Sequence, residues 1–168
     1  MQISPAYASK LIRQKNEQIR LLLAQEKELS TTTACLDEDV TKLRGQYNFS
    51  TFQEKVETLN REVVALKHAI NLFNISTVLP GLGYTIDAAL VRMKILSDQK
   101  MRFAAMKRVQ PVTRIGGGYG NKQPEYVYRN YDSADVERAY EAVENELTDI
   151  QLALDKANLE STITVEFE

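Results

Sequence analysis

The sequence has no tryptophan, one cysteine (Cys35) and one histidine (His68) among its 168 residues. One cysteine excludes a disulfide framework, and a single histidine beside it cannot complete a structural zinc site. One histidine also excludes a di-iron helical bundle, which needs a Glu-x-x-His motif on each of two helices. Apolar runs such as 21–24 are far shorter than the roughly 20 residues that cross a bilayer. We therefore expect no metal, no cofactor and no membrane partner, and we identify no small-molecule ligand.

Charge and composition favour one soluble domain. Basic residues number 21 and acidic residues 23, so the net charge of −2 does not indicate a polycation built for nucleic acid. A 43% hydrophobic content and this length are enough for a core, and we expect a single helical domain over 1–168. The N-terminus shows no apolar signal segment, and a lone thiol fits a reducing compartment, so we expect a cytoplasmic protein.

Two segments carry apolar residues at alternating steps of four and three, which is the a/d pattern of a coiled-coil-like seam. They predict helices over 51–73 and 134–157. The first seam comprises Phe52, Val56, Leu59, Val63, Leu66, Ile70 and Phe73, and the second comprises Val136, Tyr140, Val143, Leu147, Ile150, Leu154 and Ala157. Ser50 or Thr51 is the expected N-cap of the first helix, and Asp132 or Ser133 that of the second.

Two further helices are predicted over 5–31 and 86–108. Ser4 is the expected N-cap of the first, whose apolar stripe is interrupted by Lys15 and Glu26. Thr85 caps the second, which must end before Pro111. The four helices predict a mainly α protein, either an antiparallel four-helix bundle or long helical hairpins that pair between subunits.

The two seams superimpose at one constant offset, which brings Phe52 onto Val136. The same offset brings Asn74-Ile75-Ser76-Thr77 onto Asn158-Leu159-Glu160-Ser161, so each seam ends in asparagine, an aliphatic residue and a hydroxyl residue. Because asparagine tolerates the left-handed conformation, we interpret Asn74, Thr77, Asn158 and Ser161 as repeated helix-exit positions. The alternative is a buried or ligand-binding pair of asparagines.

Several of these segments together resemble the septicolysin-like family of small bacterial proteins. The resemblance rests on 85–92, on 70–74 with Thr77, and on 136–154 with Asn158 and Ser161, and it covers most of the chain. It implies a helical bacterial protein without a characterised activity, and the family name implies cytolysis. This sequence departs from the family pattern at Leu159, where an aromatic residue is usual, and over the longer, glycine-rich segment 110–130. The resemblance transfers no catalytic residue.

Individual residues offer no catalytic site. His68 occupies the outermost heptad position and is expected to face solvent. Cys35 is interpreted as a small buried residue, and 37–39 as a solvated acidic turn. The glycine-rich run 116–122 lacks the Gly-Lys-Ser/Thr sequence and the strand–turn–helix context of a phosphate loop.

Short alternating runs predict β structure outside the helices. Segments 112–115 and 126–129 flank the glycine-rich run, so we expect a β-hairpin arm within 110–131. The alternating run 162–167 predicts a C-terminal strand, which we expect to pair with this arm or with a neighbouring subunit.

The segment 84–130 is strongly basic. It holds nine lysines and arginines against three acids, whereas the remainder holds 12 against 20. The candidate interaction surface comprises Arg92, Arg102, Lys107, Arg108, Arg114, Tyr119, Lys122, Tyr126 and Tyr128. It fits either nucleic acid, with tyrosines for stacking, or packing of a basic helix beside acidic ones, and we favour the second.

Taken together, these patterns predict a non-enzymatic, homo-oligomeric binding or scaffold protein whose arm and tail mediate contacts. One alternative is a nucleic-acid-associated protein that uses 84–130. Another, suggested by the family name, is a membrane-active protein. An enzyme is the least supported class, since no acid, base and nucleophile converge.

Overall fold

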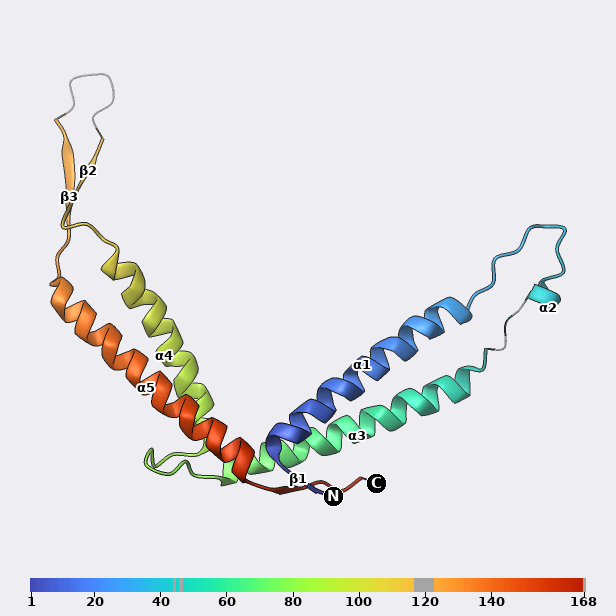
Figure 1. Ribbon diagram of the computed structural model, residues 1–168. Coiled ribbons are helices and arrows are strands. Elements are labelled where there is room, and N and C mark those ends of the chain that lie inside the picture. Colours follow the sequence, from blue (N-terminus) through green and yellow to red (C-terminus); the bar gives the residue numbers. More distant parts are fainter. Residues whose placement is uncertain (44, 46, 117–122, 168) are drawn as a thin grey trace. The chain divides into compact units, whose positions relative to one another are not determined.

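The protein is mainly helical. The computed structural model describes residues 1–43, 45, 47–116 and 123–167, and within them it contains five helices and four short strands (Figure 1). The helices are α1 (Pro5–Leu29), α2 (Val40–Leu43), α3 (Phe49–Ser76), α4 (Ile86–Lys107) and α5 (Ser133–Glu160). The strands are β1 (Gln2–Ile3), β2 (Val112–Ile115), β3 (Glu125–Tyr128) and β4 (Ile163–Thr164).

The chain divides into two compact units. The first comprises Met1–Thr77 together with the chain from Lys156 onward, and the second comprises Val78–Asp155. In the first unit α1 packs against α3, and in the second α4 lies beside α5 (Figure 1). Each unit is thus a long helical hairpin, and the expected pairing of such hairpins between subunits stays a prediction. The four-helix bundle and the single domain stay predictions.

Side-chain caps set where the helices begin. The Ser4 hydroxyl accepts a hydrogen bond from the amide of Tyr7, and the Thr85 hydroxyl accepts one from Ala88, which confirms both predicted caps. The prediction for α3 was wrong: its N-cap is Asn48, whose side chain accepts from the Thr51 amide at 3.1 Å. Asparagine is as good a cap as serine, so the helix starts earlier and takes the predicted cap residues into its first turn.

The bounds of α3 and α5 confirm the internal repeat. Both helices are 28 residues long, and the offset that aligns the two seams also aligns their first and last residues. Just after them, the Thr77 amide donates to the Phe73 carbonyl and the Ser161 amide donates to the Ala157 carbonyl. The start signal is repeated too: Asp132 is the equivalent of the N-cap Asn48, and its carboxylate accepts from the Ala134 amide at 2.8 Å.

The predicted role of the asparagines was wrong. Asn74 and Asn158 lie inside the last turns of α3 and α5, and no non-glycine residue in the described ranges has a positive φ. Thr77 instead ends α3 in an extended conformation, with φ −90° and ψ 118°. Both helices therefore continue past the asparagines, and α3 stops where the backbone turns extended.

The first helices of the two units also correspond, at an offset three residues shorter than that of the seams. Ser4 caps one and Thr85 caps the other, and Ala8 and Ala89, one turn after these caps, are both fully buried. Each unit is therefore one copy of a capped helical hairpin.

In the first unit, β1 also pairs antiparallel with β4, with Ile3 opposite Ile163.

The C-terminal tail does not pair with the arm, contrary to one of the two expected arrangements. It pairs with β1: the Met1 amine donates to the Val165 carbonyl, and the Val165 amide donates to the Met1 carbonyl. Ile163 and Val165 are buried there, with 6% and 1% of their surface exposed. A two-residue strand is too short to show alternation, so β1 left no recognisable pattern in the sequence.

Candidate interaction surfaces

The charged interruptions in the apolar stripe of α1 make contacts across the first hairpin. Lys15 forms an ion pair with Glu62 of α3. Glu26 accepts hydrogen bonds from the Tyr47 hydroxyl at 2.7 Å and from the Gln53 amide at 3.1 Å. Polar groups within a seam are satisfied in one alignment only, so these contacts fix the register of α1 against α3.

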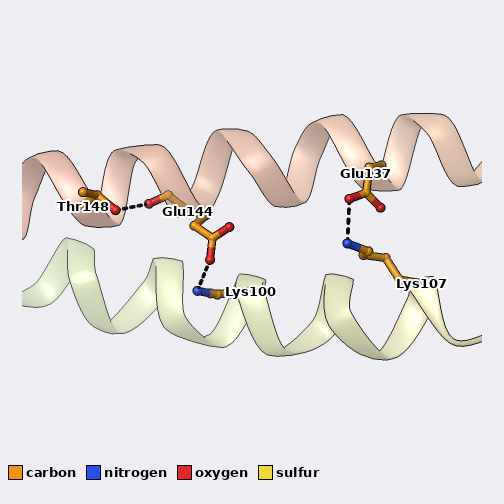
Figure 2. Close-up of polar contacts among 5 residues, drawn as sticks. All are labelled: Lys100, Lys107, Glu137, Glu144 and Thr148. Carbon is orange, nitrogen blue, oxygen red and sulfur yellow. Dashed lines mark hydrogen bonds and ion pairs between the residues drawn. The ribbon is translucent and has the colours of Figure 1, made fainter.

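The second hairpin carries a basic seam on α4 that the sequence analysis missed. Leu96, Lys100, Phe103 and Lys107 follow the same steps of four and three as an apolar seam. Lys100 forms an ion pair with Glu144 at 2.7 Å, and Lys107 forms one with Glu137 at 2.7 Å (Figure 2). The apolar residues of α4 skip from position 96 to position 103, and this gap in the seam pattern indicates that Lys100 occupies a seam position.

An aromatic ring lies beside the same two lysines. The ammonium nitrogens of Lys107 and Lys100 lie 4.4 and 5.6 Å from the centre of the Tyr140 ring, within the range of cation–π attraction. Hydrogen bonds from Lys107 to Glu137 and from Lys100 to Glu144 raise the pKa of each lysine. Both lysines therefore stay charged while they lie within the seam.

A third ion pair links α4 to α5. Arg92 donates to Glu146 through two parallel bonds, Nε to Oε1 at 2.6 Å and Nη2 to Oε2 at 2.8 Å. The hydrogen bond from Arg92 lowers the pKa of Glu146, and the same contact raises the pKa of Arg92. Glu62 and Glu146 coincide in the repeat, so equivalent acids receive the cation of the preceding helix in both hairpins.

The repeat extends to contacts near the end of each hairpin where a segment connects its two helices. Tyr47 and Tyr131 are equivalent, and both donate their hydroxyl toward the end of the preceding helix, to Glu26 and to the Met106 carbonyl, each at 2.7 Å. Each tyrosine directly precedes an N-cap. The Tyr-Asn and Tyr-Asp pairs lie at the same offset as the two seams, so the sequence itself carries this signal.

The ion pairs give a test in pH. Glu146→Gln is expected to lower the urea midpoint at pH 7, since it removes the carboxylate that Arg92 binds. A lowered folded-state pKa means that this stabilisation is complete above the ordinary value of 4.5 and is lost as the pH falls through the folded-state value. The difference from wild type, followed by circular dichroism, should therefore shrink between pH 7 and pH 3. Asp149→Asn, on the same helix, removes an exposed carboxylate that has no ion-pair partner among the described residues, and it should leave the midpoint at pH 7 nearly unchanged.

The predicted basic surface is smaller than the sequence suggested. Arg92 and Lys107 are ion-paired, which confirms, for these residues, that a basic helix packs beside an acidic one. Arg102 lies over the neighbouring Phe103 ring at 4.9 Å. Arg108 and Arg114 are exposed and have no ion-pair partner in the part of the chain that the structure describes. Tyr119 and Lys122 lie outside the described residues.

The predicted β-hairpin arm is confirmed. β2 pairs antiparallel with β3, with Val112 opposite Tyr128 and Arg114 opposite Tyr126, and β3 begins one residue earlier than expected. The Tyr126 and Tyr128 ring centres are 6.4 Å apart. Every residue of both strands is exposed.

The remaining candidates form no catalytic constellation. His68 faces solvent as expected and lines an open groove of about 400 Å³ on the outer side of α3, beside Val64 and Phe167. Cys35 is exposed, so its predicted burial was wrong, because α1 ends at Leu29 and leaves it in a connecting segment. Within the described ranges, no three metal-ligating side chains cluster.

Comparisons with known proteins identify a shared fold and no family. No family model and no curated protein matches the chain. The chain is similar to the crystal structure of a functionally unknown conserved protein from Corynebacterium diphtheriae, with a TM-score of 0.67 and 14% identity over 98% of this chain and 100% of that one. The likeness shows the fold alone. None of the described helices is long and apolar enough to cross a membrane.

Proposed function

We propose that the protein is a non-enzymatic, homo-oligomeric helical binding or scaffold protein. The observation that carries this proposal is the exposure of large aliphatic side chains on both hairpins. Val64 on α3 is 65% exposed, and Leu152 and Leu159 on α5 are 63% and 70% exposed. A two-helix hairpin covers only one stripe of each helix, so a second apolar face stays open.

Exposed aliphatic residues share the outer face of α3 with His68. Val64, Leu72 and Ile75 follow helical spacing on the side away from the seam that packs against α1, and all three are exposed. Ile75 and Leu159 are equivalent in the repeat, so both hairpins carry an exposed aliphatic residue near the end of the second helix. Association between copies would remove these side chains from water.

The native mass from light scattering tests the proposal. We expect a multiple of the 19.1 kDa chain mass, with no excess absorbance at nucleic-acid wavelengths. Val64→Glu combined with Leu152→Glu should lower the mass while leaving helicity unchanged, because both side chains are exposed in the single chain. A monomer at every concentration, with no bound nucleic acid, would contradict the proposal.

A nucleic-acid-associated function is the second candidate. It is favoured by one cation and two aromatic rings on the exposed arm, Arg114, Tyr126 and Tyr128. Binding would weaken steeply with salt, because protein cations displace condensed counterions. Absence of any mobility shift with single-stranded DNA or RNA at low salt would remove this candidate. The structure adds nothing in favour of a membrane-active function.

A further inference from the structure

The two faces of the β2–β3 hairpin differ in chemistry. Opposite residues in an antiparallel pair point to the same side, so Val112, Arg114, Tyr126 and Tyr128 share one face. Glu125 points to the other face, opposite Ile115. The charge of Arg114 is therefore not neutralised by the hairpin's own acid, and it is surrounded by apolar and aromatic surface. We refer to these four residues as the Arg114 face.

The Arg114 face has the composition of a protein-binding surface. Tyrosine and arginine are the residues that most often dominate interface energies, and here they adjoin each other. A two-stranded sheet that is exposed on both sides is marginally stable alone, so it gains from being covered. A matching partner must offer a carboxylate beside an apolar side chain.

The segment between α1 and α3 offers that combination. Leu36 is fully exposed, and Val40 and Leu43 are also exposed. The segment 35–43, which contains these three residues, also carries three acids and one lysine. Glu38 accepts from the Cys35 amide and Asp39 from the Thr41 amide, whereas Asp37 makes no hydrogen bond or ion pair among the described residues. Leu36 and Asp37 thus present an apolar side chain next to an available carboxylate.

The surroundings strengthen this complementarity. The described part of 108–129 holds three arginines and one glutamate, the reverse of the balance in 35–43. Both segments connect the two helices of their unit, so they occupy equivalent places in the repeat, and they carry opposite net charge. Opposite potentials favour encounter of these two segments and disfavour pairing of either with itself.

We propose that the Arg114 face binds the Leu36–Asp37 segment of a second copy of this chain. The proposal rests on the homo-oligomeric function proposed above and adds a second, charged contact to the exposed apolar faces on which that function is argued. Arg114 pairs with Asp37, and Leu36 packs against Tyr126 and Tyr128. Since the two surfaces differ, the contact is head-to-tail and generates a closed ring or an open filament.

Charge reversal tests the proposal. Arg114→Glu or Asp37→Lys alone should weaken association about tenfold or more, because each puts like charges opposite each other. The two variants should again associate with each other in an equimolar mixture, since both possible contacts between them are oppositely charged. Arg102→Glu and Asp149→Lys are the matched controls: they make the same charge changes at exposed positions away from both surfaces. Circular dichroism confirms that each variant keeps its helices.

The outcomes separate this inference from the proposed function. A wild-type protein that is monomeric at all concentrations overturns both. An oligomer whose mass is unchanged by both reversals, or two variants that fail to associate with each other when mixed, overturns the inference alone. Loss of nucleic-acid binding in Arg114→Glu, with its assembly intact, also overturns it and assigns the face to nucleic acid.

Discussion

Replacing Leu66 or Ile150 with alanine is expected to lower the free energy of unfolding by about 2–5 kcal/mol. Both side chains are fully buried in the seams of their hairpins, and they occupy equivalent positions in the repeat. Each substitution removes three carbons from a closely packed site and leaves a cavity that long, rigid helices can close only in part. Urea denaturation followed by circular dichroism measures the loss.

Matched controls lie close to each site on the same helices. Val64→Ala and Leu152→Ala shorten aliphatic side chains that are mostly exposed in the single chain, so the expected loss for each is within about 0.5 kcal/mol. The measurement belongs at a protein concentration where the chains are dissociated. Equal losses for buried and exposed substitutions would contradict the assignment of the seams as the core.

The long helices were predictable because their signal is repeated many times. Each seam gives seven apolar positions at one period, and tertiary packing of the whole stripe outweighs any single local preference. The ends were less predictable. Asn48 and Ser50 are both good caps, and which one starts the helix depends on backbone geometry that the sequence alone does not specify.

The contacts of the charged residues were the hardest to foresee. Lys100 and Lys107 resemble ordinary surface lysines in the sequence. Their spacing places them in the seam of α4, but their partners Glu144, Glu137 and the Tyr140 ring are found only in the folded hairpin. The basic character of the third predicted helix was apparent from composition. Only the three-dimensional register shows which of its cations form ion pairs within the hairpin and which stay available for a partner.

Truncation after Ser161 is expected to destabilise the first unit by about 3–6 kcal/mol, because it removes two buried side chains worth about 1.5–3 kcal/mol each. Ile163 and Val165 are almost fully buried, and β4 also supplies the partner of β1. The N-terminus would lose both hydrogen bonds that join Met1 to Val165. Urea denaturation of wild type and truncated chain measures the loss.

A shorter truncation provides the control and separates two roles for the tail. Removing only Phe167 and Glu168 leaves β4 and Val165 in place, and Phe167 is partly exposed, so the urea midpoint should change little. The sequence led us to expect a tail that mediates contacts between subunits, whereas its burial against β1 makes it part of the folded unit. If the longer truncation left the midpoint unchanged and lowered only the native mass, the tail would be an interface element and its pairing with β1 would contribute little to stability.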